Sequence, residues 1–444
     1  MKARNFFIET YGCQMNDHDS EKISGILCHR GMVPVRSVKE ADLVIINTCS
    51  IREKAAQKVY SRLGEIRKKK GERKDFLIGV VGCVAQQEGT EMALKAPFID
   101  MIVGTHLYHT IPDLLDDIEL SQESTCEETH VNTTFLEDVA PVEMISPTTR
   151  NSSFRANITI MEGCNKHCSF CIVPFTRGKE RNRRATHIFD EAKKAIDEGY
   201  VEILLLGQTV NAYRDPTMAR YRFSNLLYDL ASIKGLKRLR FTSPHPREFN
   251  DETVAVISES NVICNQIHLP LQSGSNRVLK RMRRQYTREK FLQIIEKFNA
   301  CSRPVAFSTD IIVGFPGEDE KDFEETIQLI KIVEFESMFS FKYSERPKTE
   351  ASIWKDNVPE IVKSQRLTNL QLLQKKIQLK LNKKRYLGKR FPVLVEGKAR
   401  DGINLFGRTT TNRVVNFLSD KEPGSLVNIR VKSIGPNSLK GEQV

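Results

Sequence analysis

The chain has 444 residues, of which 40% are hydrophobic and 28% are charged, a composition typical of a soluble globular protein with two or three domains. It contains no run of 18 apolar residues, and its first residues lack the apolar segment of a secretion signal, so we expect a cytoplasmic protein without a membrane anchor. Its ten cysteines are then poor candidates for a disulfide framework, and its net charge of +12 fits either a polyanionic partner such as nucleic acid or a solvated basic surface.

Residues 1–120 predict a parallel-sheet α/β domain. Apolar runs typical of buried strands alternate with amphipathic stretches typical of helices, which is the pattern of a parallel sheet covered on both faces. Asn16 or Asp17 is the expected cap of the first helix, and Gly31 is its expected stop. The expected strands are 5–12, 41–50, 75–85 and 99–105, and the expected helices are 16–31 and 52–70.

Residues 121–149 differ in composition from the chain on either side. They are acidic and rich in Ser and Thr, and no Lys or Arg occurs between Pro97 and Thr149. The alternation of strands and helices also stops here. We therefore interpret 121–149 as a linker.

Residues 150–382 predict a second α/β domain, a partial (β/α)6 barrel. Six strand candidates occur in it, and most are followed by a helical stretch. A long amphipathic helix, 361–388, closes this domain, and the short strands and frequent turns of 383–444 predict a small antiparallel β barrel. The expected strands are 156–163, 201–208, 237–243, 265–273, 306–315 and 339–345, and the expected helices include 188–199 and 288–300.

Three cysteines, Cys164, Cys168 and Cys171, follow the first strand of this predicted barrel. Thiolates ligate zinc and iron–sulfur clusters, but a structural zinc site usually takes four ligands in two separated pairs. Three thiolates on a tight loop can instead hold three irons of a four-iron cluster and leave the fourth iron open. An open iron at the carboxyl end of a barrel strand indicates chemistry. A zinc site completed by His167 is the alternative.

A second set of cysteines, Cys13, Cys49 and Cys83, ends three predicted parallel strands of the first domain. Buried packing is the ordinary role of a single free cysteine. Three cysteines at equivalent strand ends can converge, because neighbouring strands lie only about 4.8 Å apart. We therefore predict a second cluster with three ligands and one open iron, provided that the strand order brings these ends together.

The motif CNKHCSFC (164–171) resembles the cluster loop of the radical S-adenosylmethionine (SAM) enzymes. Further motifs extend this resemblance over essentially the whole chain to the radical SAM methylthiotransferases. The motifs are YGCQMN (11–16), INTCSIREKA (46–55), GCVAQQ (82–87), HLPLQSGSNRVLKRMRRQYT (268–287), FKYSERP (341–347) and GRTTTNRVVNF (407–417).

This resemblance implies two [4Fe-4S] clusters, with the six cysteines above as their catalytic ligands. SAM bound at the cluster of the second domain would be cleaved to a 5′-deoxyadenosyl radical, and the cluster of the first domain would hold the sulfur to be transferred. Polar and glycine residues at later strand ends fit SAM binding, although each on its own also suits an ordinary strand-to-helix turn. They are Gly207, Gln208, Ser243, Gln272, Ser273, Asp310, Gly314 and Glu318.

The resemblance also implies a C-terminal TRAM domain that binds RNA. The basic runs 177–184 and 277–290 flank the predicted active-site mouth, and residues 383–444 hold 13 basic and 5 acidic residues. Solvated surface is the ordinary role of such runs, but together they can contact the phosphates of a tRNA anticodon stem-loop. The candidate RNA contacts are Arg177, Arg181, Arg183, Arg184, Arg281, Arg283, Arg284, Arg346, Phe406, Arg408, Asn412, Arg413 and Phe417.

The activity that the resemblance implies is radical-SAM-dependent insertion of a methylthio group at C2 of N6-isopentenyladenosine, next to the anticodon of tRNA. We expect a monomer that takes electrons from a flavodoxin or ferredoxin. One alternative is the same reaction on threonylcarbamoyladenosine tRNA or on a ribosomal protein. An alternative of another class is a non-catalytic RNA-binding iron–sulfur sensor, which would release no 5′-deoxyadenosine.

Two further features complete the sequence-based expectations. Lys348, in RPKTEA (346–351), stands where the family has glycine, and it affects the expected local turn and substrate contact. The other cysteines match no ligand pattern, and we expect no function for them. They are Cys28, Cys126, Cys264 and Cys301.

Overall fold

The computed structural model describes residues 4–50, 53–73, 75–121, 129–135 and 150–444. The chain forms two compact units. Unit 1 comprises Met1–Asn151, Glu162–Lys166 and Cys171–Arg181, and unit 2 comprises Ser152–Met161, His167–Phe170 and Asn182–Val444. The segment that carries the CNKHCSFC motif therefore contributes to both units.

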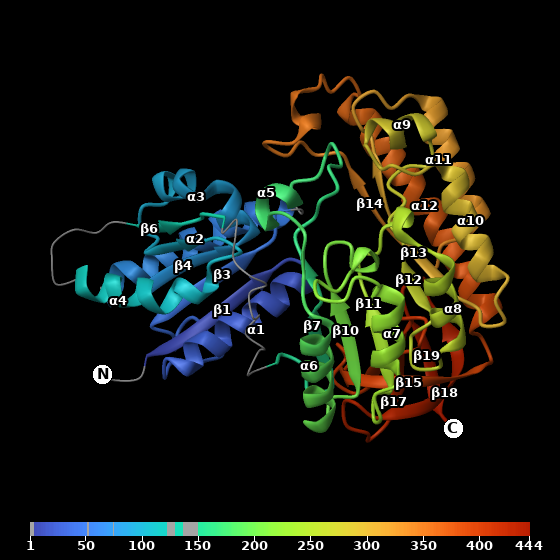
Figure 1. Ribbon diagram of the computed structural model, residues 1–444, viewed down its shortest axis with the longest axis horizontal. Helices are drawn as coiled ribbons and strands as arrows, with labels where there is room; N and C mark the ends of the chain where they lie inside the picture. The colour runs from blue at the N-terminus through green and yellow to red at the C-terminus, as the bar shows by residue number, and fades with distance from the viewer. Residues whose placement is uncertain (1–3, 51–52, 74, 122–128, 136–149) are drawn as a thin grey trace. The chain divides into compact units, whose positions relative to one another are not determined.

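Unit 1 is built on a six-stranded, fully parallel sheet with the order β2-β1-β3-β4-β5-β6 (Figure 1). This confirms the parallel sheet that the sequence predicts. Strand β6 lies within 121–149, the range expected to be a linker, and pairs with β5 as the edge strand of the sheet. The elements are β1 (Asn5–Tyr11), α1 (Gln14–His29), β2 (Val33–Pro34), β3 (Leu43–Thr48), α2 (Glu53–Glu72), β4 (Leu77–Gly82), α3 (Cys83–Lys95), β5 (Met101–Val103), η1 (Tyr108–Thr110), α4 (Ile111–Ser121), β6 (His130–Asn132) and α5 (Val173–Arg177).

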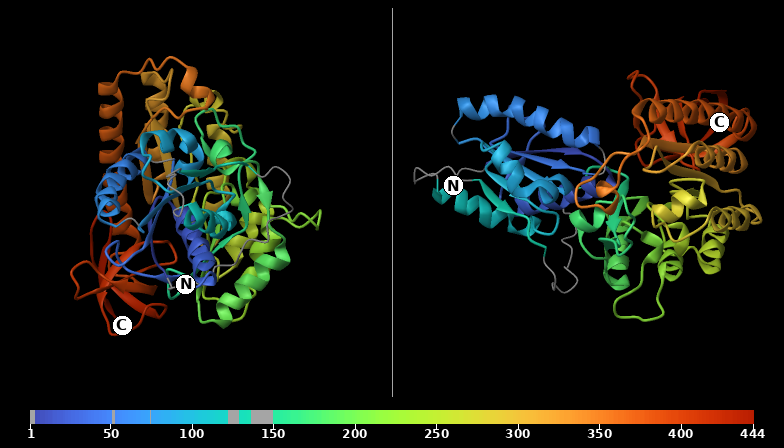
Figure 2. Two further views of the ribbon diagram at one scale, coloured as in Figure 1. Left: turned by 90° about the vertical axis from the view of Figure 1, so that its left-hand side faces the viewer. Right: turned by 90° about the horizontal axis from the view of Figure 1, so that it is seen from above.

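Helices cover both faces of this sheet (Figures 1 and 2). On one face Ile23 of α1 and Ile111 of α4 pack on alternate strand residues, and on the other face Leu63 of α2 and Met92 of α3 do the same. Strands β3 and β4 are therefore buried along their whole lengths, as continuous apolar runs predict. Because both faces are covered, the open carboxyl ends of the strands are the natural place for a site.

Helix α1 begins earlier than the sequence predicts. Its N-cap is Cys13, which precedes Gln14, so the predicted cap at Asn16 or Asp17 is wrong. Asn16 instead lies inside the first turn, where its side chain reaches Cys13 and a neighbouring strand. The predicted end is confirmed, because the helix stops at His29 and Gly31 adopts a positive φ of 85°.

The larger part of unit 2 is an open barrel of six parallel strands, as predicted. The strands form two sheets, β11-β10-β7 and β12-β13-β14, and Ile263, just before β12, forms a single parallel bridge with Leu239 of β11. The elements are β7 (Arg155–Thr159), α6 (Ala185–Asp197), β10 (Glu202–Leu206), η2 (Val210–Ala212), α7 (Phe223–Ala231), β11 (Arg238–Phe241), η3 (Pro246–Glu248), α8 (Asp251–Glu259), β12 (Gln266–His268), α9 (Asn276–Arg281), α10 (Arg288–Asn299), β13 (Ala306–Val313), α11 (Glu320–Val333), β14 (Ser337–Lys342), η4 (Glu350–Ile353) and α12 (Glu360–Arg385); the short strands β8 (Met161–Glu162) and β9 (Arg181–Asn182) form a two-stranded sheet.

The helices of unit 2 bury one large apolar core against these strands. Ile188 of α6, Leu226 of α7, Phe298 of α10 and Leu329 of α11 all belong to it. The long helix α12 packs on β14 and adds Leu370. The strand-and-helix order therefore leaves the carboxyl ends of the strands to the loops, where catalytic groups of such barrels lie.

Residues 383–444 form a closed five-stranded barrel with the order β15-β16-β17-β19-β18 (Figure 2). Four of its five strand pairings are antiparallel, but β17 and β19 pair in parallel, so the prediction of an antiparallel barrel is corrected at that closure. Phe417 fills its core. The strands are β15 (Arg390–Lys398), β16 (Leu405–Arg408), β17 (Val414–Leu418), β18 (Leu426–Ile434) and β19 (Leu439–Gln443).

A buried ion pair and buried hydrogen bonds join this small barrel to the rest of unit 2. Glu336, just before β14, accepts a hydrogen bond from Arg413 Nη2 at 3.1 Å and one from Tyr386 Oη at 2.9 Å. Arg240 of β11 donates to the carbonyl oxygen of Thr409 at 2.9 Å. The two parts therefore share a polar seam in which every named side chain is buried.

No helix in the described ranges is both long enough and apolar enough to span a bilayer.

Candidate metal centres and nucleic-acid surface

The sheet order places Cys13, Cys49 and Cys83 at neighbouring strand ends. Strand β3 pairs with β1 on one side and with β4 on the other, and each cysteine follows one of these three strands. A hydrogen bond with Cys49 lowers the pKa of Cys13 to about 6, against the opposing effect of burial. The predicted second cluster requires a strand order that brings these three strand ends together, and the sheet has that order. Binding of the cluster stays a prediction.

Beside these cysteines, the backbone at Gly12 and at Gly82 packs directly against side chains of the neighbouring strand. A Cβ atom at Gly12 would lie 2.5 Å from the Cβ of Cys49, and one at Gly82, whose φ is 90°, would lie 2.3 Å from Oδ1 of Asn47. Only glycine fits such positions. The closeness of the three strand ends therefore depends on these two glycines.

Two buried asparagines support this cysteine set, and the sequence did not predict this role for either of them. Asn16 donates from Nδ2 to Oδ1 of Asn47 at 3.0 Å, and Asn47 donates from Nδ2 to the carbonyl oxygen of Asn16 at 2.9 Å. Cys13 donates from Sγ to Asn16 at 3.4 Å. The signal was present in the motifs YGCQMN and INTCS, in which each asparagine lies within three residues of a cysteine.

Arg177 is a buried cation of unit 1, and its prediction as an RNA contact is wrong. Its Nη2 donates to Oδ2 of Asp19 at 2.6 Å, and Tyr108 donates to the same oxygen at 3.1 Å. Burial raises the pKa of Cys83, and the nearby Arg177 guanidinium opposes that rise. A positive charge beside Cys83 favours its thiolate, the form that ligates iron.

The CNKHCSFC segment is held separately within each unit. In unit 1, the backbone N–H of Cys164 donates to the carbonyl oxygen of Gly178 at 3.1 Å. In unit 2, Sγ of Cys168 accepts a hydrogen bond from Nη1 of Arg284 at 3.3 Å. Cys171 lies in unit 1 and is half-buried. Among the described residues, no group of three or more His, Cys, Asp or Glu side chains is arranged to hold a metal ion, so both the cluster at Cys164, Cys168 and Cys171 and the alternative zinc site with His167 stay predictions.

Several predicted SAM contacts occupy unusual positions at the strand ends of unit 2. Ser243 and Gln272 adopt positive φ values of 56° and 70°, in the region that favours glycine. Oε1 of Gln208 is buried without a hydrogen-bond partner in the described structure, which fits a polar ligand at this strand end. Asp310 accepts a hydrogen bond from Nε2 of His268 at 3.1 Å, so His268 is a polar group at this site that the sequence analysis missed.

Other predicted SAM contacts have internal partners. A Cβ atom at Gly314 would lie 2.3 Å from Cγ of Lys363, so close packing requires this glycine. Buried Glu318 accepts hydrogen bonds from the N–H of Gly314 and from Arg366.

Ser273 is also a predicted SAM contact with a partner inside the protein. Its buried hydroxyl lies 3.4 Å from the hydroxyl of Thr326. Gly207 would place a Cβ 2.5 Å from Met161. These contacts give packing roles to all four positions, and SAM binding by them stays a prediction.

The structure corrects the list of candidate RNA contacts. Besides Arg177, four of them are buried, with at most 6% of their surface exposed, and so present no phosphate-binding surface. Arg183 pairs with Glu191 at 2.8 Å. The four are Arg183, Arg284, Arg413 and Phe417. The exposed or half-buried candidates are Arg181, Arg184, Arg281, Arg283, Arg346, Phe406, Arg408 and Asn412.

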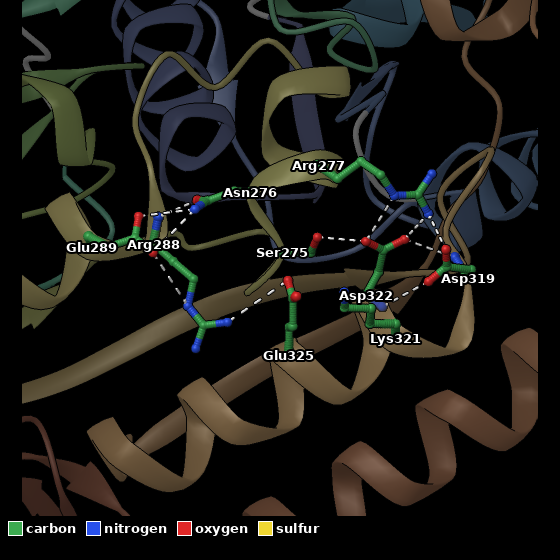
Figure 3. A pocket seen from close by; sticks show the side chains of 9 residues that line it. All are labelled: Ser275, Asn276, Arg277, Arg288, Glu289, Asp319, Lys321, Asp322 and Glu325. Carbon is green, nitrogen blue, oxygen red and sulfur yellow. Dashed lines mark hydrogen bonds and ion pairs between the residues drawn. The ribbon is translucent and has the colours of Figure 1, made fainter.

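A polar pocket lies between the loop that starts α9, the N-terminal turn of α10 and α11 (Figure 3). Its charged groups pair with one another: Arg277 faces Asp322 in Figure 3 and also pairs with Asp319 at 2.7 Å. None of the predicted SAM contacts lines it. The pocket is therefore an ion-pair network between outer elements of the barrel. Its lining residues are Ser275, Asn276, Arg277, Arg288, Glu289, Asp319, Lys321, Asp322 and Glu325.

The cysteines expected to lack function have ordinary surroundings where they are described. Cys28 and Cys301 pack against hydrophobic cores, and Cys264 is buried. Cys126 lies outside the described residues.

Lys348 adopts a φ of 65°, in the left-handed region. A side chain costs about 1–2 kcal/mol in this conformation. We therefore expect Lys348→Gly to raise the free energy of unfolding by about 1 kcal/mol, after allowance for the greater freedom of glycine in the unfolded chain. Urea denaturation checks this.

Lys355→Gly is a matched control, because Lys355 is exposed in the same region and its φ is not positive. This control is expected to lower the free energy of unfolding by a few tenths of a kcal/mol. Equal losses of stability in both variants would contradict the prediction for Lys348.

The partial barrel and the cysteine motif that follows its first strand define a radical SAM protein. Residues 158–330 match the radical SAM superfamily, residues 384–444 match the TRAM domain, and residues 5–104 match an uncharacterized protein family, UPF0004. The radical SAM family uses a [4Fe-4S] cluster and SAM.

Solved structures agree with this fold. A radical SAM methyltransferase from Kitasatospora setae, bound to tryptophan and a SAM analog, has a TM-score of 0.58 and 14% identity, and the match covers 79% of this chain and 75% of that one. A cobalamin-dependent SAM radical enzyme has a TM-score of 0.54 and 12% identity, and the match covers 84% of this chain and 56% of that one.

Sequence relatives are much closer. A tRNA-2-methylthio-N(6)-dimethylallyladenosine synthase from Clostridium botulinum is 44% identical over 99% of this chain and 97% of its own length. The enzyme of the same name from Carboxydothermus hydrogenoformans is 44% identical over 97% of both chains. The chain belongs to this family of radical SAM tRNA methylthiotransferases.

Proposed function

We propose that this protein inserts a methylthio group at C2 of N6-isopentenyladenosine, next to the anticodon of tRNA. The observation that carries the proposal is the full-length identity to relatives named for this reaction, 44% over 99% of the chain. The convergence of β1, β3 and β4 at Cys13, Cys49 and Cys83 supports it. A radical SAM fold alone would not specify this substrate.

Six cysteines would hold two [4Fe-4S] clusters in this proposal. Cys164, Cys168 and Cys171 would hold the cluster that binds SAM, and Cys13, Cys49 and Cys83 would hold the second cluster, where the sulfur resides. When bound, these groups would supply single-electron transfer, radical chemistry on the substrate and the sulfur to be transferred. The protein supplies thiolate ligands, buried arginines beside them, and polar groups at strand ends that orient SAM.

The test is an anaerobic assay of reconstituted protein with SAM, dithionite and isopentenylated tRNA. Mass spectrometry of the digested tRNA is expected to show the 2-methylthio nucleoside, together with release of 5′-deoxyadenosine. Modification only of threonylcarbamoyladenosine tRNA or of a ribosomal protein would assign one of those alternatives instead. Absence of 5′-deoxyadenosine would leave the non-catalytic sensor.

The exposed arginines of the two basic runs and of the small barrel are the proposed tRNA contacts. Arg283 is exposed at the end of α9, and Arg408 is half-buried on β16. Phosphate contacts of this kind position RNA without reading its sequence. An exposed basic surface of a TRAM domain suits the stem of an anticodon stem-loop.

Replacing Arg184, Arg281 and Arg408 together with Gln is expected to weaken tRNA binding and to flatten its salt dependence. Each lost phosphate contact lowers the slope of log K against log salt by about 0.7–0.9. Fluorescence anisotropy at several salt concentrations measures this slope. Replacing the buried Arg183 alone is expected to leave the slope unchanged, and equal slopes for the triple variant and the wild type would contradict the proposed contacts.

The remaining parts of the proposal concern the surroundings of the enzyme. We propose a cytoplasmic monomer, since the proposed substrate is tRNA. We propose a flavodoxin or ferredoxin as its electron donor, because SAM cleavage in this chemistry needs single electrons at low potential.

A further inference from the structure

Arg284 contacts a cysteine of the predicted SAM-binding cluster from a distant part of the chain. Its Nη1 donates to Sγ of Cys168 at 3.3 Å, across 116 residues of sequence. Both residues belong to unit 2. Arg284 is only 6% exposed, so this positive charge is not available to solvent or to RNA.

The position of Arg284 is determined by other hydrogen bonds. Its Nη2 donates to the carbonyl oxygen of Pro270 at 3.3 Å, and its Nε donates to Oη of Tyr286 at 3.2 Å. Tyr286 in turn donates to the carbonyl oxygen of Leu271 at 2.7 Å. Because these partners leave Nη1 directed at Cys168, the guanidinium is oriented without any contribution from a metal.

The same turn also holds the backbone next to Cys168. The backbone N–H of Ser169 donates to the carbonyl oxygen of Met282 at 3.2 Å. The side-chain hydroxyl of Ser169 donates to the carbonyl oxygen of Arg281 at 2.9 Å. Phe170 packs edge-to-face on Phe315. The middle of the cysteine loop is therefore anchored to the turn 281–284, and Arg284 is the member of that turn that reaches a sulfur.

We propose that Arg284 is a positioning residue that holds Cys168 for its cluster and makes that cluster easier to reduce. A cationic donor to a thiolate offsets negative charge, and reduction adds negative charge to the cluster. Hydrogen bonds to ligand sulfurs are one of the established ways in which a protein sets the potential of an iron–sulfur cluster. The inference rests on the proposed cluster at Cys164, Cys168 and Cys171.

The proposal predicts different behaviour for Arg284→Lys and Arg284→Met. Lysine retains a cationic donor, whereas methionine fills similar space without one. In full-length reconstituted protein, Arg284→Met is expected to lower the equilibrium constant for cluster reduction about tenfold relative to Arg284→Lys, which is about 59 mV for a one-electron couple. It is also expected to retain less iron.

The measurement is an electron paramagnetic resonance redox titration, combined with iron and sulfide analysis. The signal that changes on addition of SAM identifies the cluster in question. Arg220→Met is the matched control, because Arg220 is an exposed arginine of unit 2 outside both basic runs, and the cluster potential of this variant is expected to equal that of the wild type. Thermal unfolding of the metal-free variants checks their folding.

Each result decides the proposal. A lower potential or lower iron content in Arg284→Met than in Arg284→Lys supports it. Equal values in the two variants, including an equal loss of the cluster, would overturn it, because the cationic donor would then make no difference. Absence of any SAM-sensitive cluster in the wild type would instead refute the proposed function on which the inference rests.

Discussion

Replacing Cys13, Cys49 and Cys83 with Ala is expected to abolish methylthio transfer and to leave reductive cleavage of SAM. The structure places these cysteines at the ends of three adjacent strands of unit 1, and Cys168 lies in unit 2 with its own donor, Arg284. Loss of one ligand set therefore leaves the other intact. Iron content is expected to fall by about half, from two four-iron clusters to one.

The complementary variant replaces Cys164, Cys168 and Cys171 with Ala. It is expected to retain one cluster and to release no 5′-deoxyadenosine, which liquid chromatography of the reaction detects. Cys28→Ala is the matched control, since Cys28 packs in a hydrophobic core and is expected to affect neither quantity. Loss of SAM cleavage in the first variant, or zinc in place of iron in either, would contradict the assignment.

Glu336→Ala is expected to cause the largest loss of stability that we predict, about 3–5 kcal/mol. Removing this carboxylate leaves Arg413, which is 5% exposed, without its buried anionic partner, and leaves the hydroxyl of Tyr386 without its carboxylate acceptor. An uncompensated buried cation carries the full cost of desolvation. The seam between the small barrel and the rest of unit 2 is then expected to open.

Urea denaturation followed by the fluorescence of Trp354, the only tryptophan, measures this loss, and limited proteolysis detects release of residues 383–444. Glu442→Ala is the control, because Glu442 forms an exposed ion pair with Lys432 at 2.7 Å in the same barrel. Its effect is expected to stay below about 1 kcal/mol. Similar losses in the two variants would show that the buried seam adds no stability.

The sequence did not predict which arginines of the two basic runs are buried. Nothing local distinguishes Arg177 from Arg184, or Arg284 from Arg283. Arg177 is buried because Asp19 meets it from 158 residues away, and Arg284 is buried because Tyr286 and Pro270 hold it against Cys168. A charge run predicts a basic surface, but Arg177 and Arg284 each contact a partner, Asp19 and Cys168, that lies 158 and 116 residues away in the chain.

Local sequence patterns were sufficient to predict the strands and to place the cysteines at strand ends. Continuous apolar runs determined the strands 43–48 and 77–82. Cys49 and Cys83 follow these strands directly and Cys13 lies two residues after the end of β1, so the sequence placed all three correctly at strand ends, and their role as ligands stays a prediction. The same patterns determined the six parallel strands of the open barrel and the small barrel after them. Hydrophobic periodicity carries this information because it depends on neighbours in sequence.

The tertiary structure alone decided which strand ends are adjacent and which charges are buried. The order β1-β3-β4 makes Cys13, Cys49 and Cys83 neighbours, and the parallel pairing of β17 with β19 closes the small barrel. It also decided that two predicted RNA contacts, Arg177 and Arg284, lie beside cysteines instead. Strand order and ion pairing join residues far apart in the chain, so no property of a single segment determines them.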